Sequence, residues 1–95
     1  MHAVDTYLDH LRIERRLSPR TVESYSHDLV MLDRFALGSE RTVEMLGRQD
    51  LEAFVRGLMT AGLSPRTVAR VVACVRGFYR FMAVDRRLAT VGRVN

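Results

Sequence analysis

The chain contains the sequence Leu-Ser-Pro-Arg-Thr-Val twice, at residues 17–22 and again at residues 63–68. In each copy the serine is a good helix N-cap, because its hydroxyl can accept a hydrogen bond from an early backbone N–H. The proline that follows presets the backbone torsion of the first helical residue. The two copies therefore predict two similarly built helices, around which the rest of the chain is arranged.

The first copy separates two amphipathic stretches. Residues 3–17 and 19–37 each carry apolar side chains at spacings of three and four, the period of a helix that buries one face. Gly38 is the expected stop of the second helix. The outer face of this helix is polar but only mildly basic, with Glu23 and Asp28 at its borders, so a solvated face and a binding face fit it equally well. That face holds Arg20, Ser24, His27, Met31 and Arg34.

A connection follows over residues 39–50, with one short helical turn expected at residues 42–46. Val43 and Leu46 would anchor this turn to the core. Asp50 is the expected N-cap of a third helix, and Gly62 is its expected stop. The apolar stripe of this helix indicates a scaffold role.

The second copy opens a fourth helix, expected over residues 65–84. Its apolar side chains and its arginines occupy two separate arcs of about 120° each. Small residues lie between the arginines (Ala69, Ala73 and Gly77), so the backbone can approach whatever the arginines bind. Like charges four residues apart are unfavourable by a few tenths of a kcal/mol, and residues 66–84 contain no acid. This face therefore indicates an anionic partner, to be bound by Arg66, Arg70, Arg76 and Arg80.

Composition limits the class of protein. Ninety-five residues suffice for one domain that buries about 60 to 65% of the unfolded chain's surface. Neither a signal peptide nor an apolar run long enough to cross a bilayer is present, so we expect a cytoplasmic protein with no membrane association. Residues 1–50 carry seven arginines against nine acids, whereas residues 51–95 carry eight against two. The second half therefore holds the positive field that phosphate binding requires.

The residues that could carry catalysis form no recognisable constellation. The three histidines have no cysteine or carboxylate at metal-ligand spacing, and neither a glycine-rich phosphate loop nor a nucleophile elbow occurs. The lone cysteine, Cys74, cannot form an internal disulfide. We therefore expect no catalytic residues, no metal, no cofactor and no small-molecule substrate. A helix with a basic face fits the DNA major groove, which is about 12 Å wide.

An ordered set of residues runs through the four predicted helices. It comprises Tyr7, Leu8, Leu11, Leu17, Ser18, Thr21, Tyr25, Asp28, Leu29, Asp50, Leu51, Phe54, Gly62, Thr67, Arg70, Arg76, Phe78 and Tyr79. Over residues 5–88 this set resembles the N-terminal core-binding domain of the Xer-type tyrosine recombinases, in the phage integrase family. Two positions depart from the family pattern. Ala73 stands where a serine is common, and no Asn-Pro pair follows Leu88.

The resemblance implies an all-α, four-helix SAM-like orthogonal bundle over residues 1–88, with residues 89–95 at the start of an interdomain linker. It implies that the second and fourth helices clamp a recombination half-site of double-stranded DNA through the major groove. The first helix would touch a neighbouring recombinase protomer. In such enzymes a catalytic domain follows in sequence, so residues 1–95 are not expected to act as an enzyme by themselves. The DNA-binding residues would be Arg20, Thr21, Ser24, His27, Arg66, Thr67, Arg70, Arg76 and Arg80.

One function of another class remains open. A helical interaction module could bind an acidic partner, or self-associate, through the same arginine face or through Ile13, which lies opposite the apolar stripe of its helix. An independent transcription regulator would need a dimer on paired half-sites, and the sequence contains no recognisable dimerisation element. The target DNA sequence, and the choice between chromosome-dimer resolution and movement of a mobile element, stay open.

Overall fold

The computed structural model describes the backbone of residues 2–94 and the side chains of residues 3–84. Within these residues four α-helices are joined by loops and two short helical turns, and no β-strand occurs. The prediction of an all-α, four-helix protein is confirmed. The elements are α1 (His2–Asp9), the π-helical turn η1 (His10–Glu14), α2 (Pro19–Gly38), the 3-10 turn η2 (Val43–Met45), α3 (Arg48–Thr60) and α4 (Pro65–Val94).

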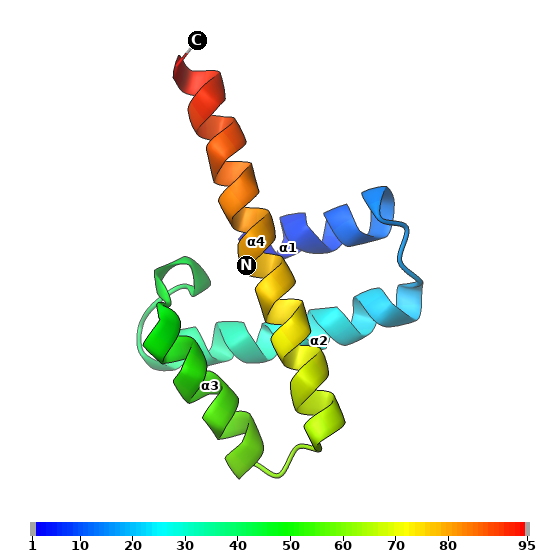
Figure 1. The fold of residues 1–95 in the computed structure, drawn as a ribbon, viewed down its shortest axis with the longest axis vertical. Coiled ribbons are helices and arrows are strands. Elements are labelled where there is room, and N and C mark those ends of the chain that lie inside the picture. The colour runs from blue at the N-terminus through cyan, green and yellow to red at the C-terminus, as the bar shows by residue number, and fades with distance from the viewer. Residues whose placement is uncertain (1, 95) are drawn as a thin grey trace.

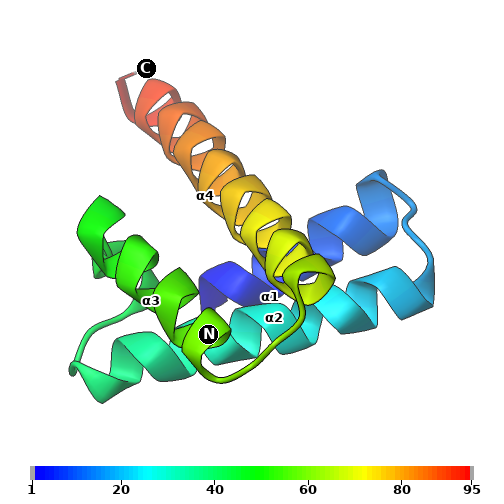
Figure 2. The same ribbon diagram turned by 60° about the horizontal axis from the view of Figure 1, so that its bottom comes forward.

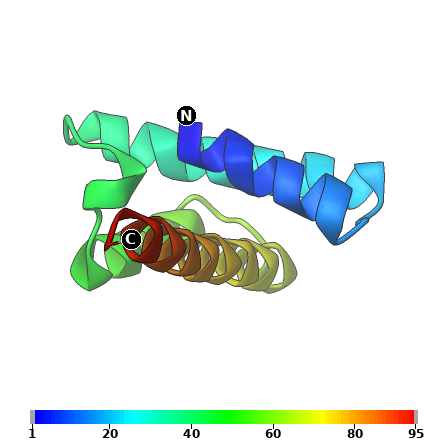
Figure 3. The same ribbon diagram turned by 90° about the horizontal axis from the view of Figure 1, so that it is seen from above.

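The helices form two layers. In Figure 3, α1 and α2 lie side by side in one layer, and α3 and α4 form the other. Helix α4 runs across both α1 and α2 and contacts them, as Figure 1 shows. Helix α3 packs against α4, and its Phe54 ring also contacts Phe35 of α2 at a centroid distance of 5.4 Å. The loop between α3 and α4 places the first half of α4 over α2 (Figure 2). The two helices opened by the repeated sequence therefore cross each other.

Apolar side chains from both layers pack against one another between the helices. Leu11, Leu29, Leu32, Val71 and Phe78 are each at most 1% exposed. Burial of side chains of this size contributes roughly 1.5 to 3 kcal/mol each. Helix α4 supplies more of this core than any other helix, which explains how a valine-rich helix of modest intrinsic propensity is held.

The two copies of the repeated sequence form the same cap. The Ser18 hydroxyl accepts a hydrogen bond from the Thr21 backbone N–H at 3.2 Å, and the Ser64 hydroxyl accepts one from the Thr67 N–H at the same distance. Each serine also shares a hydrogen bond with the threonine hydroxyl, at 2.9 Å and 3.0 Å respectively. The prediction of two matching helix starts is confirmed.

Helix α3 ends as the sequence predicts. Gly62 has a φ of +87°, the left-handed conformation that glycine adopts without strain. The N–H of Gly62 donates to the Met59 carbonyl at 3.0 Å, and the N–H of Leu63 donates to the Leu58 carbonyl at 3.3 Å. These two bonds form a Schellman motif, which turns the chain into the second serine cap.

The start of α3 differs from the prediction. Gly47, not Asp50, is the N-cap, and Asp50 lies in the first turn. Its carboxylate accepts the Gly47 N–H at 2.8 Å and two bonds from the Arg41 guanidinium at 2.8 and 2.9 Å. These bonds, Arg41 first, hold the pKa of Asp50 below its usual value. The carboxylate reaches back to the cap as a capping-box residue does, and this role is hard to distinguish from an N-cap in sequence.

The first helix was predicted as one α-helix over residues 3–17, and this is wrong beyond Asp9. The chain widens into the π-helical turn η1, closed by a bond from the Arg15 N–H to the His10 carbonyl at 3.2 Å. Arg16 then adopts a left-handed φ of 52°. Neither glycine nor asparagine marks this reversal in the sequence. Packing of Leu11, 1% exposed, accompanies the wider turn.

The fourth helix was predicted to end near Val84, but α4 continues to Val94. In Figure 1 its last turns extend beyond the other helices. Residues 85–94 carry no apolar side chains at helical spacing, so the sequence pattern did not indicate a helix there. Arginine, leucine and alanine within residues 85–94 are good helix formers, so the existing helix can propagate through them. The assignment of residues 89–95 to a linker stays a prediction.

Candidate nucleic-acid interface

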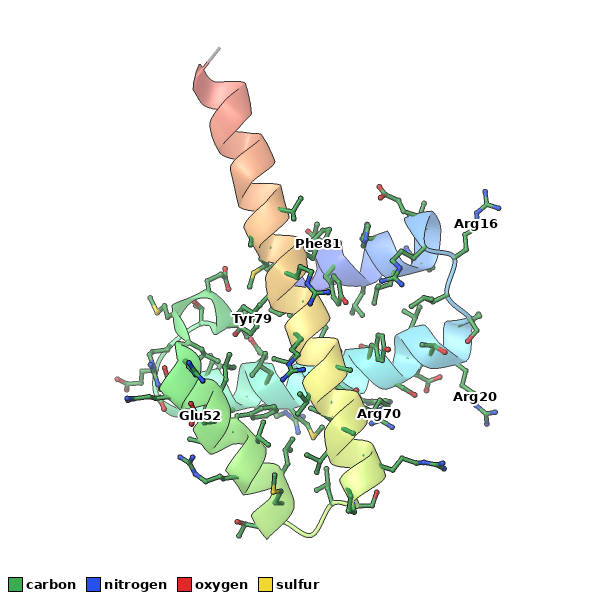
Figure 4. The ribbon with its side chains drawn as sticks, in the orientation of Figure 1. Arg16, Arg20, Glu52, Arg70, Tyr79 and Phe81 are labelled. Atoms are coloured by element: carbon green, nitrogen blue, oxygen red, sulfur yellow. The ribbon has the colours of Figure 1, made fainter. Side chains whose placement is uncertain are left out.

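The crossing of α2 and α4 lies at Asp28 and Arg70. From this crossing the first turns of α2 and of α4 extend in two directions and leave a corner between them (Figure 4). We call the surface of residues 18–28 and 64–73 the α2–α4 corner. It contains seven of the nine predicted DNA-binding residues: Arg20, Thr21, Ser24, His27, Arg66, Thr67 and Arg70.

An ion pair between α2 and α4 joins the two arms of the corner. The Arg70 Nη2 donates to Asp28 Oδ1 at 2.7 Å, and Nε donates to Asp28 Oδ2 at 3.1 Å. Asp28 is fully buried, whereas the Arg70 side chain is 43% exposed. The expectation that Asp28 borders the solvated face of its helix is therefore wrong. The arginine arc of α4 is free of acids in its own helix, but α2 supplies one.

The ion pair lowers the net positive charge of the arginine face of α4, but Arg70 stays exposed on that face. Hydrogen bonding to Asp28, then the opposite charge of that carboxylate, raises the pKa of Arg70. The guanidinium is therefore always protonated, and its charge is largely balanced by Asp28. Among the described residues, Arg20 and Arg66 have no ion-pair partner, and both are exposed. Three arginines against Glu23 and Asp28 leave the corner with a net charge of +1, and Arg20 and Arg66 are its cations without an acidic partner in the described part of the chain.

The remaining polar groups of the corner are engaged to different degrees. The hydroxyls of Thr21 and Thr67 bond to the capping serines, so their first role is to hold the helix starts. The His27 side chain is 75% exposed, with Nε2 3.9 Å from a carboxylate oxygen of Glu23. Ser24 is partly exposed on the same helix. A hydroxyl and an imidazole are thus available beside the two unpaired arginines.

Arg76 and Arg80 lie away from the corner. Arg76 lines a groove of ≈ 650 Å³ between α3 and α4, whose other lining residues include Phe54 and Val55. Arg80 lines a second groove of ≈ 650 Å³ between η1 and α4, together with Ile13. The four arginines share one arc of the helical wheel, but neighbouring helices divide that arc into separate surfaces.

Gly77 was expected to let the backbone of the fourth helix approach a ligand, but it contacts another helix. A Cβ atom on Gly77 would lie 2.5 Å from the Tyr7 hydroxyl oxygen. Helix α4 therefore uses this glycine to admit α1, not a ligand. The expectation of an open backbone holds for Ala69 and Ala73, which are both exposed on the corner.

Asp28 is the functional candidate that sequence reasoning missed. At 100° per residue it lies only about 40° from Leu32 on the helical wheel of α2, and Leu32 is fully buried. A carboxylate that close to an apolar stripe needs a cation to compensate its burial. The arginines of the fourth helix have no acid in their own helix and could supply that cation. A helical wheel of one helix, however, cannot show which of them reaches Asp28.

The side chains that could act as nucleophiles, Cys74 and Tyr79, are packed in or against the core. Burial raises the pKa of the Cys74 thiol to about 12 and that of the Tyr79 hydroxyl to about 12. Cys74 is 1% exposed, and Tyr79 donates to the Val43 carbonyl at 2.7 Å. No three His, Cys, Asp or Glu side chains within residues 3–84 come together as a metal site. None of the helices in the described part of the chain is both long enough and apolar enough to span a membrane.

Comparison with known proteins agrees with this architecture. Residues 4–86 match the family described as phage integrase, N-terminal SAM-like domain. The chain is 33% identical over 96 residues to the tyrosine recombinase XerC of Ralstonia pickettii, which covers 97% of this chain and 29% of that protein. It is 37% identical over 82 residues to XerC of Alcanivorax borkumensis, which covers 86% of this chain and 26% of that protein.

The chain therefore belongs to the phage integrase N-terminal SAM-like domain family. It spans little more than a quarter of the length of these curated relatives. No solved structure matches it. The resemblance drawn from the ordered residues of the four helices is confirmed.

Proposed function

We propose that this chain is the DNA-binding module of a site-specific tyrosine recombinase, and that it clamps one recombination half-site through the major groove. The observation that carries the proposal is the α2–α4 corner, where two identically capped helices cross and present Arg20 and Arg66 without acidic partners among the described residues. Helix N-termini bind phosphate, because their free N–H groups and the helix dipole favour an anion.

Each predicted residue has a role in this proposal. Arg20 and Arg66 contact phosphates on the two sides of the groove, and Thr21 and Thr67 hold the helix starts against the backbone. Ser24 and His27 face the base edges from α2, and Arg70 faces them from α4. Arg76 and Arg80 contact the flanking phosphates along α4, since both are exposed. Phosphate contacts of this kind fix the register of a protein on DNA.

The wider setting follows from the same proposal. The partners are double-stranded DNA and other recombinase protomers on the same site, in the cytoplasm. Strand cleavage belongs to a catalytic domain of the recombinase. No catalytic, metal-binding or cofactor-binding residue is assigned within residues 1–95.

The proposal is tested by titrating the chain with a fluorescent duplex of random sequence at several salt concentrations. A plot of log affinity against log salt should fall with a slope of about −0.9 for each phosphate contact. Neutral variants of Arg20 or Arg66 (to glutamine) should each reduce the slope by about 1. A nearly flat plot for the unmodified chain contradicts DNA binding.

Arg12 offers the matched control. It lies on the α1 side of the molecule and pairs with Asp9 at 2.8 Å, and its side chain is 63% exposed. Arg12→Gln removes the same formal charge as the corner variants. It should leave the slope unchanged, so an equal loss in this variant would point to net charge instead of the corner.

A second candidate function has its own observation. Ile13 is 63% exposed and Val84 is 50% exposed, and both line the groove between η1 and α4. This surface suits a protein partner or a second copy of the chain. Sedimentation with and without duplex separates the two functions, because a stable oligomer that is indifferent to DNA favours the protein-interaction module.

A further inference from the structure

Asp28 is the only buried charged side chain among residues 3–84. It is fully buried, yet the arginine that it binds is 43% exposed. A buried ion pair is weak evidence for a stabilising role, because the cost of removing two charges from water offsets much of their attraction. The half-exposed position of Arg70 at the crossing of α2 and α4 (Figure 4) points to a function at the surface.

The two hydrogen bonds define which edge of the guanidinium is used. Asp28 accepts from Nε and from Nη2, which together form the side edge of the planar group. Arginine has five N–H donors in a fixed fork. The end of the fork, with one N–H from Nη1 and one from Nη2 pointing in parallel, is therefore left without a partner in the described structure.

We propose that Asp28 is a positioning residue that holds Arg70 so that its free end reads a guanine in the major groove. This inference rests on the proposed DNA-binding function. Two parallel N–H groups match the O6 and N7 acceptors of guanine, and bidentate arginine is the commonest specific contact to that base. A guanidinium whose plane is already fixed loses less conformational freedom on binding.

The surroundings of Arg70 favour a base contact over a phosphate contact. Ala69 and Ala73 are exposed beside Arg70, and their short side chains leave room for base-pair edges to approach the helix. The long exposed side chain on the same face is Arg66, one turn nearer the start of α4. Arg20 and Arg66 lie in the first turns of their helices and have no described partner. A phosphate contact needs charge but no fixed orientation. Of the three arginines in the corner, Arg70 is the one whose orientation is fixed and whose charge is largely balanced.

The test begins with the unmodified chain and a duplex library with 12 randomised base pairs, from which the preferred site is selected. We expect a guanine at one or more selected positions. Replacing that guanine with 7-deazaguanine, which lacks the N7 acceptor, should weaken binding by roughly tenfold or more. This measurement needs no folded variant.

Two variants then test whether the Asp28–Arg70 pair makes the contact to guanine. Arg70→Lys keeps the charge but lacks the parallel N–H groups, and Asp28→Asn keeps the size of the side chain but not its charge. Both should lower the preference for that guanine by roughly tenfold. Arg70→Lys should change the affinity for non-selected duplex little, whereas Asp28→Asn should raise it, because the Arg70 charge is then no longer balanced. Arg12→Lys is the matched control, because Arg12 is also paired with an aspartate but lies outside the corner, and it should keep the preference.

The outcomes separate three cases. Equal guanine preference in the unmodified chain and in both variants, with only a lower melting temperature in the variants, would show a purely structural pair and overturn the inference. Indifference of the unmodified chain to 7-deazaguanine at every selected guanine would also overturn it. Absence of any salt-dependent duplex binding would instead reject the proposed function on which the inference rests.

Discussion

Replacing Arg70 with methionine is expected to lower the free energy of unfolding by about 3 kcal/mol or more, because the variant leaves a buried carboxylate without its cation. Asp28 is 0% exposed and bonds to Arg70 through both oxygens. Methionine keeps much of the length and apolar contact of the arginine stem. The loss therefore reports mainly the missing charge, and chemical denaturation measures it.

The same pair predicts a recovery in a double variant. Replacing a buried ion pair with apolar residues of similar size is often neutral or stabilising. Asp28→Leu combined with Arg70→Met should therefore regain most of the stability that Arg70→Met loses. An Arg70→Met variant within about 1 kcal/mol of the unmodified chain would contradict the assignment, since an exposed ion pair contributes about that much or less.

Gly77→Ala is expected to destabilise the chain by about 1 to 2 kcal/mol, although alanine is the better helix former. The new methyl group would lie 2.5 Å from the Tyr7 hydroxyl oxygen, and overpacking of this kind costs about 1 to 3 kcal/mol. The tyrosine cannot move freely, because its ring contacts Phe78 and Phe81 at centroid distances of 5.7 and 5.3 Å.

Two matched variants isolate this contact. A Cβ atom added to Gly57 of α3 would have nothing within 4 Å. Gly57→Ala should therefore stabilise the chain by about 0.5 to 1 kcal/mol. In a Tyr7→Phe background the nearest remaining ring atom is 3.7 Å from the Gly77 Cβ position. In that background Gly77→Ala should raise the free energy of unfolding. Thermal unfolding of the four variants gives the sign directly, and stabilisation by Gly77→Ala alone would contradict the packing.

Local signals explain why the helices could be predicted. The serine caps at Ser18 and Ser64, and the left-handed Gly62, act through bonds within a few residues of the chain. Such bonds depend on the local sequence alone, so helix starts and stops can be predicted from it. The η1 turn surrounds the buried Leu11, and no glycine or asparagine marks it. The continuation of α4 beyond Val84 carries no apolar stripe that would indicate a helix. Those two features were predicted wrongly.

The site was harder to predict for the same reason. Asp28 and Arg70 are 42 residues apart in sequence, and only the crossing of α2 and α4 brings them together. A helical wheel treats each helix alone, so it placed the four arginines on one face and Gly77 beside them. The neighbours supplied by α1, α2 and α3 divide that face into a corner and two grooves.

The most direct test of DNA binding at the α2–α4 corner is a titration of the ¹⁵N-labelled chain with a duplex, followed by amide chemical shifts. Shifts should concentrate on residues 18–28 and 64–73, with smaller ones around Arg76 and Arg80 of α4, and the amides of α1 should change little. Shifts concentrated on η1 and α3, with the corner unaffected, or no shifts at saturating duplex, would contradict the proposal.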